Sequence, residues 1–179
     1  VRVELICDGV HLHPATVRTT FKMFGDDRIC LISDSMMATG LSDGDYSLGG
    51  QPVKVVGNLA TLADGTIAGS ATNLMDCMRT AVKKMGIPLG SAVKCAAVNT
   101  AKAIGIYDTY GSITPGKKAN IVLLDQDLNM KHLIFKGELQ KKAQQKRNLI
   151  VGSFFIAYLK FDFSQRPQSV RSLLVQFVV

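Results

Sequence analysis

Residues 28–34, Arg-Ile-Cys-Leu-Ile-Ser-Asp, decide the fold class, because they form a nearly continuous apolar run that stops at a carboxylate. A second run, residues 1–7 (Val-Arg-Val-Glu-Leu-Ile-Cys), stops in the same way at Asp8. Apolar strands without polar alternation are typical of parallel sheets, which are buried on both faces. Between the two runs, residues 14–24 predict a helix that begins with a proline and ends before Gly25. These segments predict one β-α-β unit of an α/β protein.

The remaining segments predict a small β appendage, then helices, then strands. Residues 53–62 and 66–68 flank the turn Asp64-Gly65, which indicates a β-hairpin. Apolar spacing and glycine stops predict helices over residues 72–85, 88–97 and 99–106. Strands are predicted over residues 119–125 and 130–139.

Charge and hydropathy exclude two classes of partner. The net charge is +7, but residues 1–140 hold 14 Lys and Arg against 13 Asp and Glu, whereas residues 141–179 hold seven against one. The basic charge therefore belongs to the tail, and we expect no nucleic-acid partner. No run of about 18 apolar residues occurs, so we expect no membrane span. A hydrophobic content of 47% is enough for a packed core.

The four cysteines, at positions 7, 30, 77 and 95, contain no C-x-x-C pair. Without paired spacing they do not predict a zinc site. Their apolar surroundings favour reduced, buried cysteines in a cytoplasmic protein.

Asp34 is the first candidate for chemistry, because it ends a buried strand. Burying an ionised carboxylate is costly unless it is paired or does work. The carboxyl ends of parallel strands are where α/β proteins place their sites. The alternative is that Asp34 caps the turn or helix formed by the residues that follow it.

His11 and His13 stand two residues apart, so on an extended chain both side chains would face the same way. Neutral imidazole is a ligand for zinc or iron. Two ligands do not make a site, however, and the only other histidine is His132. We therefore predict no metal site built from this chain alone.

The stretch Asp64-Gly-Thr-Ile-Ala-Gly-Ser70 precedes a predicted helix and is the third candidate. Backbone N–H groups at such a turn can bind an anionic or carbonyl oxygen. The alternative is an ordinary helix N-cap, with Ser70 or Thr72 satisfying the first turn.

Five stretches, taken in this order, carry a family resemblance: Asp8-Gly-Val-His-Leu-His-Pro14, Leu31-Ile-Ser-Asp-Ser-Met-Met-Ala-Thr-Gly40, Gly65-Thr-Ile-Ala-Gly-Ser70, Asn99-Thr-Ala-Lys-Ala-Ile-Gly105 and Gly111-Ser-Ile-Thr-Pro-Gly-Lys-Lys-Ala-Asn-Ile-Val-Leu-Leu-Asp125. Together they resemble the N-acetylglucosamine-6-phosphate deacetylases of the amidohydrolase superfamily. The last stretch is shared by many amidohydrolases, whereas the first three are more specific. The resemblance covers about residues 1–140.

The resemblance implies the C-terminal part of a (β/α)8 TIM-like barrel of a metal-dependent hydrolase, with strands of a small β-sandwich. Residues 1–110 would supply the last βα units of the barrel, and residues 111–140 the strands of the sandwich. Residues 141–179 stay unassigned, as a basic and aromatic tail.

The resemblance also implies an activity. Such enzymes hydrolyse the acetamide of N-acetylglucosamine 6-phosphate to glucosamine 6-phosphate and acetate with a divalent metal, zinc or iron, and a homodimer is expected. Asp34 matches the family's catalytic aspartate and His11 its substrate-contacting histidine. Ile67, Ala68 and Gly69 match a turn that lines the sugar site.

The family's metal ligands, a glutamate and two histidines, come from earlier strands that have no match here. We therefore expect the ligands to lie mostly outside this chain, and the chain to be a C-terminal fragment that is inactive alone. Two alternatives stay open: another cyclic-amidohydrolase activity, such as a dihydroorotase-like one, and a non-catalytic remnant or partner-binding fragment.

Overall fold

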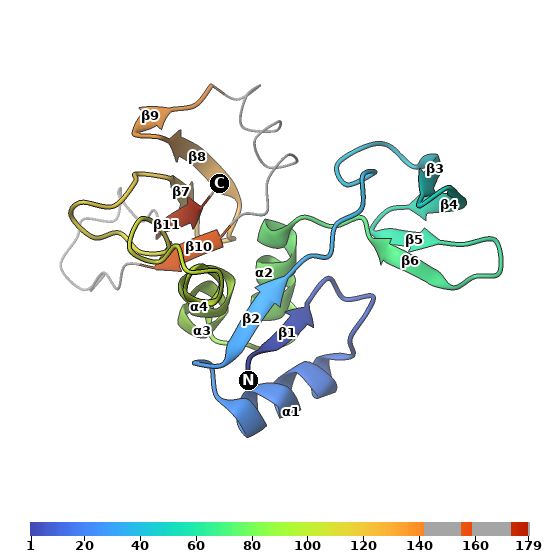
Figure 1. Cartoon of the computed structure of the whole chain (residues 1–179), viewed down its shortest axis with the longest axis horizontal. Helices are drawn as coiled ribbons and strands as arrows, with labels where there is room; N and C mark the ends of the chain where they lie inside the picture. Colours follow the sequence, from blue (N-terminus) through green and yellow to red (C-terminus); the bar gives the residue numbers. More distant parts are fainter. Residues whose placement is uncertain (142–154, 159–172, 179) are drawn as a thin grey trace.

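The computed structural model describes residues 1–141, 155–158 and 173–178, whose strands form three sheets (Figure 1). The first sheet pairs β1 (Val3–Ile6) with β2 (Ile29–Ile32) in parallel, and α1 (Pro14–Phe24) connects them. The predicted β-α-β unit is confirmed. Gly25 ends α1 with a φ of 67°, a left-handed conformation that glycine adopts without steric cost.

A four-stranded antiparallel meander follows, in the order β3 (Gly44–Leu48), β4 (Gln51–Val56), β5 (Leu59–Thr61) and β6 (Ile67–Ser70). The hairpin predicted at Asp64-Gly65 joins β5 to β6, and Gly65 has a φ of 86° there. The meander projects from the rest of the molecule on the right of Figure 1.

The helices are α2 (Leu74–Lys83), α3 (Leu89–Val93), the π-helical turn η1 (Lys94–Val98) and α4 (Asn99–Ala103). The prediction of two separate helices over 88–97 and 99–106 is wrong, because α3, η1 and α4 form one continuous run. Asn99 keeps helical dihedral angles, φ −68° and ψ −39°. Its side chain, which often caps helix ends, donates instead to the carbonyls of Asp26 and Ile29 at 2.6 and 2.7 Å.

The third sheet has the order β10 (Phe155–Tyr158), β11 (Leu173–Val178), β7 (Ile121–Leu124), β8 (Met130–Phe135) and β9 (Glu138–Leu139). The strands predicted over 119–125 and 130–139 are confirmed as β7, β8 and β9. The sequence left residues 141–179 unassigned, so it did not predict the pairing of β11 with β7. This pairing brings part of that segment into the sheet. Apart from Lys141, β10 and β11, the residues of that segment lie outside the described residues.

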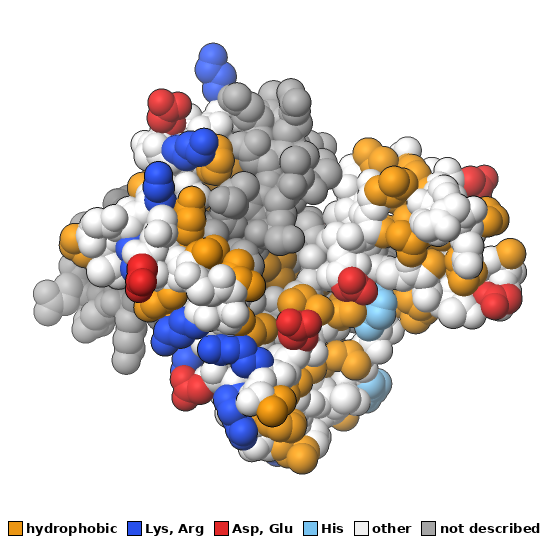
Figure 2. Space-filling view, in the orientation of Figure 1, with side chains coloured by type: hydrophobic (Ala, Val, Ile, Leu, Met, Phe, Trp, Pro, Cys, Tyr) orange, Lys and Arg blue, Asp and Glu red, His pale blue; other side chains and the backbone are white. Residues whose placement is uncertain are grey.

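Two hydrophobic cores result. The larger one joins β1, β2, the helices and β7–β8, and its fully buried members include Ile29, Leu31, Met78, Met85, Leu124 and Leu133. The smaller one lies under the meander: Met36, Ala38, Val53, Val55, Ala60, Ala68 and Ala71. On the surface of the meander, Figure 2 shows hydrophobic side chains, and Leu48, Val56, Leu59 and Ile67 are exposed there. All four cysteines are buried, as their apolar surroundings predict.

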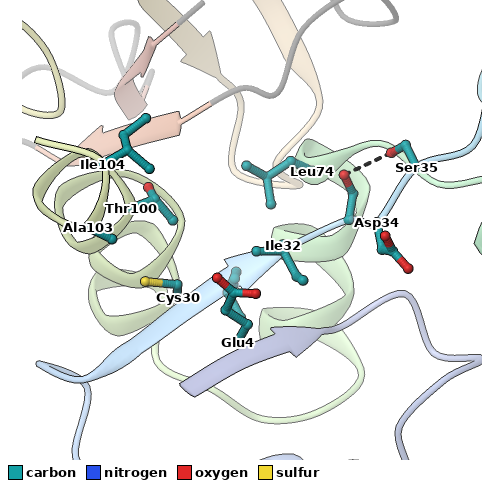
Figure 3. Close-up of a pocket in the computed structure, with 11 residues that line it drawn as sticks. Glu4, Cys30, Ile32, Asp34, Ser35, Leu74, Thr100, Ala103 and Ile104 are labelled. Carbon is teal, nitrogen blue, oxygen red and sulfur yellow. Dashed lines mark hydrogen bonds between the residues drawn. The ribbon is translucent and has the colours of Figure 1, made fainter. Parts of the chain in front are cut away.

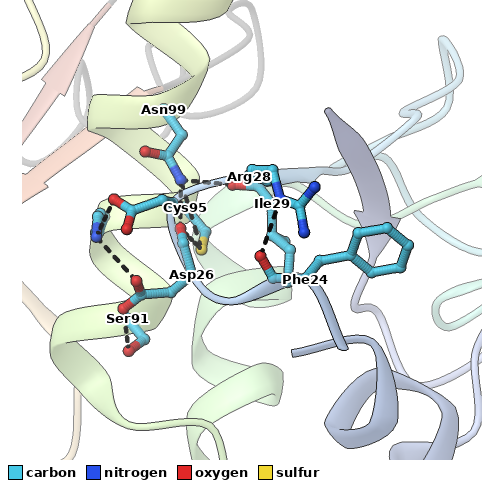
Figure 4. Close-up of polar contacts among 9 residues, drawn as sticks. Phe24, Asp26, Arg28, Ile29, Ser91, Cys95 and Asn99 are labelled. Atoms are coloured by element: carbon cyan, nitrogen blue, oxygen red, sulfur yellow. Dashed lines mark hydrogen bonds and ion pairs between the residues drawn. The ribbon is translucent and has the colours of Figure 1, made fainter. Parts of the chain in front are cut away.

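The start of β2 is anchored by a polar network between the α1–β2 loop and the helical run (Figure 4). Asp26 accepts hydrogen bonds from Ser91 Oγ at 2.7 Å and Lys94 Nζ at 2.8 Å. These bonds, from Lys94 first and then Ser91, lower the pKa of Asp26. The network fixes the amino end of β2, opposite to the end at which Asp34 lies.

Candidate functional site

The candidate site lies at the carboxyl ends of β1 and β2. These strands are parallel and in register, with Ile6 beside Ile32, so the chain leaves both at the same edge. Asp8 follows β1 and Asp34 follows β2. Polar residues that follow two neighbouring strands therefore lie at the same edge of the sheet, as the sequence predicts.

Asp34 is held by its backbone. Its carbonyl accepts a hydrogen bond from the N–H of Ser70 at 3.1 Å, and the N–H of Met36 donates to the carbonyl of Ser70 at 2.8 Å. Ser35 and Ser70 thus form a parallel bridge that joins the end of β2 to β6. Asp34 has a φ of 49°, a left-handed conformation that is uncommon outside glycine and often marks functional sites.

The side chain of Asp34 differs from expectation. Asp34 follows a strand that is largely buried, as predicted, but the residue itself is exposed, so the cost of burying a carboxylate does not arise. The capping alternative also fails, since among the described residues no N–H donates to this carboxylate. Among the described residues, the Asp34 carboxylate therefore has no hydrogen-bond or ion-pair partner.

A cavity of about 410 Å³ lies along the edge of β2 that pairs with no described strand (Figure 3). Its walls are mostly apolar: Cys30, Ile32, Leu74, Ala103 and Ile104 contribute, and Asp34 and Ser35 lie at one end. In Figure 3 the Asp34 carboxylate points away from Ile104. The lining includes neither His11 nor residues 67–69, so this cavity is distinct from the predicted sugar site.

His11 is held by Asp8. The Nδ1 atom of His11 lies 2.8 Å from Oδ2 of Asp8, whose side chain is fully buried, while 19% of the His11 side chain is exposed. The N–H groups of Val10 and His11 donate to Oδ1 of Asp8 at 2.9 and 3.0 Å. Burial works to raise the pKa of Asp8, but these hydrogen bonds and His11 outweigh it and lower the pKa.

His13 has a structural role. It is the N-cap of α1, and its Nδ1 accepts a hydrogen bond from the N–H of Ala15 at 3.2 Å. His11 and His13 therefore bond to different partners. The loop that carries them is not extended, so the expectation that both side chains face the same way is wrong. Among residues 1–141, no group of three or more His, Cys, Asp or Glu side chains could hold a metal ion.

Residues 67–70 form β6 and lie beside the end of β2. Ile67 is exposed, Ala68 is buried, and a Cβ atom on Gly69 would lie 3.8 Å from the carbonyl oxygen of Asp34. The structure thus places residues 67–70 next to Asp34. This is necessary if both belong to one site. Neither Ser70 nor Thr72 caps the next helix; Asn73 does, accepting from the N–H of Asp76 at 3.0 Å.

Sequence reasoning missed Asp8 as a member of the site. The signal was present, because an aspartate three residues before a histidine in a glycine turn can accept from both the backbone and the ring. It also missed Ser35, whose hydroxyl donates to the carbonyl of Thr72 at 2.7 Å and ties the end of β2 to the segment before α2. Nothing in the sequence indicated that contact.

Comparison with known proteins agrees with the resemblance. The amidohydrolase family model matches residues 3–164. The chain is 38% identical over 145 residues to N-acetylglucosamine-6-phosphate deacetylase of Bacillus subtilis, and covers 37% of that protein. It is 35% identical over 137 residues to N-acetylgalactosamine-6-phosphate deacetylase of Escherichia coli O157:H7, and covers 36% of it.

Among solved structures, the chain resembles a mutant N-acetyl-D-glucosamine-6-phosphate deacetylase from Mycobacterium smegmatis in complex with N-acetyl-D-glucosamine-6-phosphate. The identity is 40% and the TM-score 0.72, over 78% of this chain and 37% of that one. The chain therefore spans little more than a third of the length of these relatives. No helix in the described part of the chain is long and apolar enough to cross a membrane.

Proposed function

Because the chain belongs to the amidohydrolase family, we propose that it carries the C-terminal part of the site of an amino-sugar-phosphate deacetylase. The substrate would be N-acetylglucosamine 6-phosphate, and the products glucosamine 6-phosphate and acetate. The observation that carries the proposal is the exposed carboxylate of Asp34 at the end of β2, held by its backbone against Ser70.

The proposed reaction is hydrolysis of an amide by general acid–base catalysis. Asp34 takes a proton from the water that attacks the acetyl carbonyl carbon. The carbon–nitrogen bond then breaks, and Asp34 returns the proton to the leaving amine, so that atoms and charge balance. His11 contacts the substrate beside the reacting amide, and residues 67–69 line the sugar.

The amidohydrolase family is generally metal-dependent, but the described residues do not fit a metal site of their own. His11 bonds to Asp8 and His13 caps α1. Among the described residues, Asp34 belongs to no group of three or more side chains that could hold a metal ion. We propose that the ligands of a divalent metal, zinc or iron, lie mostly outside this chain.

A second substrate has a specific observation in its favour. The relative in Escherichia coli O157:H7 is named for N-acetylgalactosamine 6-phosphate, and its identity of 35% is close to the 38% of the Bacillus subtilis relative. The two sugars differ only in the orientation of one hydroxyl. We favour the glucosamine substrate, and a homodimeric, cytoplasmic enzyme belongs to the same proposal.

The test is a chimera that joins this chain to the part of the Bacillus subtilis relative that it does not cover. The purified chimera is assayed for release of acetate from both hexosamine phosphates, and for opening of a cyclic amide. Turnover of N-acetylglucosamine 6-phosphate above the other two substrates supports the proposal. Faster opening of the cyclic amide favours the dihydroorotase-like alternative, and a folded chimera without turnover favours the non-catalytic one.

Two histidine variants of the chimera form a matched pair. We expect His11→Asn to lower kcat/KM strongly, because the imidazole would contact the substrate. His13→Asn should have little effect, because asparagine is itself a good N-cap and can replace the bond to Ala15. A larger loss for His13→Asn would contradict the assignment of these roles.

A further inference from the structure

The carboxylate of Asp8 is oriented by its surroundings toward one side chain, that of His11. Its carboxylate is fully buried, and one of its two oxygens, Oδ1, already accepts two backbone hydrogen bonds, from Val10 and His11. The turn depends on Gly9, whose φ of 84° is costly for other residues. Only Oδ2 is left to face His11. The direction of this oxygen is therefore fixed by the backbone and not by a flexible side chain.

We propose that Asp8 is a positioning residue that fixes both the direction and the tautomer of the His11 imidazole. An ionised carboxylate can only accept hydrogen bonds. At 2.8 Å from Oδ2, Nδ1 of His11 must therefore carry the proton and donate it. In the neutral ring, the other nitrogen, Nε2, is then left with its lone pair.

The two contacts of the ring restrict what it can recognise. With Nδ1 committed to Asp8, the neutral imidazole presents a hydrogen-bond acceptor at Nε2. Such an acceptor recognises a hydroxyl or N–H donor and not a carbonyl oxygen. This consequence rests on the proposed function, in which His11 contacts an amino sugar that carries both kinds of donor. The tautomer itself does not depend on the activity.

The test is nitrogen-15 NMR of this chain, which contains only three histidines. The His11 signals are identified by their loss in His11→Asn, and they are followed as the pH is raised until they no longer change. We expect a protonated Nδ1 and an unprotonated Nε2. A protonated Nε2 in the unmodified chain would overturn the proposal.

Asp8→Asn sharpens the test. An amide can present an N–H donor to Nδ1, so we expect the proton to move to Nε2. Asp64→Asn is the matched control, because Asp64 also accepts a backbone N–H, that of Thr66 at 2.9 Å, in an exposed turn. It should leave the His11 signals unchanged. An unchanged tautomer in a folded Asp8→Asn variant would contradict the role of Asp8.

In the chimera, we expect Asp8→Asn to lower kcat/KM by about 10–100-fold, the loss that follows removal of the hydrogen-bond partner of a metal-ligating histidine, because His11 depends on its partner in the same way. Addition of substrate should shift Nε2 of His11 in the active chimera. A chimera without turnover would refute the proposed function alone, because the tautomer of the isolated chain still decides the role of Asp8.

Discussion

The two hydrophobic cores of the described chain differ in the size of the side chains that they bury. The larger core contains long side chains from two strands, the helices and the sheet of β7 and β8, among them Leu31 and Met78. The core of the meander contains seven residues, of which four are alanine and two are valine. Since the free energy of burial scales with apolar area, the meander has far less to hold it in place.

The candidate site lies where these two regions meet. The larger core, with the Asp26 network at its edge, holds β2 and so presents the side chains of Asp8, His11 and Asp34. The meander contributes backbone, through Ser70 and the turn at Gly69. Because the larger core buries more apolar area, we expect the candidate residues Asp8, His11 and Asp34 to stand on the more rigid region, and the meander to be the less stable one.

The largest expected effect concerns the carboxylate on the rigid strand. In the chimera, Asp34→Asn should lower kcat by about 10²–10⁴-fold, the usual cost of removing a general acid–base group. Asp45→Asn, which changes an exposed aspartate on β3 of the meander, is the control and should stay near the unmodified rate. Equal rates for the two variants would contradict a catalytic role for Asp34.

The next effect concerns stability. Leu31→Ala removes a fully buried side chain from the larger core and should lower the free energy of unfolding by about 2–5 kcal/mol. Urea unfolding followed by far-ultraviolet circular dichroism measures it. A loss below about 1 kcal/mol would mean that the residues around β2 relax into the space left by the removed side chain. This core would then be less rigid than we infer.

A matched valine pair compares the cores directly. Val17 is 0% and Val55 is 2% exposed, so Val→Ala removes the same buried groups at each, worth about 1.6 kcal/mol at about 0.8 kcal/mol per methylene. We expect Val17→Ala to shift the global transition. Val55→Ala should instead speed amide hydrogen exchange within β4 and β5 only. Equal shifts of the global transition would show that the meander unfolds together with the rest.

The smallest effect is a pH dependence. The folded pKa of Asp8 is lowered from its ordinary value of about 3.9, so its contribution to stability is present above that value. It is lost as the pH falls through the lower folded pKa. The stability gap between the unmodified chain and Asp8→Asn should therefore narrow below about pH 4.

Asp64 provides the comparison for this titration. Its pKa is also lowered, first by the N–H of Thr66, but the side chain is exposed on the meander turn. Asp64→Asn should hardly change the unfolding transition at any pH. A larger pH-dependent gap for Asp64 than for Asp8 would contradict the assignment of rigidity to the β1–β2 side.

The elements that could be predicted without coordinates are those whose signals are local. Pro14 and Gly25 bound α1, the apolar runs become β1 and β2, and Asp64-Gly65 turns the hairpin, because proline, glycine and burial act within a few residues. The family motifs, too, could be recognised without coordinates. These signals were enough to place Asp34 and His11 at the end of the sheet.

Contacts between distant parts of the chain could not be predicted in this way. The bridge between Ser35 and Ser70 joins residues 35 positions apart, directly beside Asp34 with its left-handed backbone. Asn99 stays helical because carbonyls some 70 residues away accept its side chain. Such contacts depend on how whole elements pack, whereas capping and turn signals depend only on neighbours along the chain.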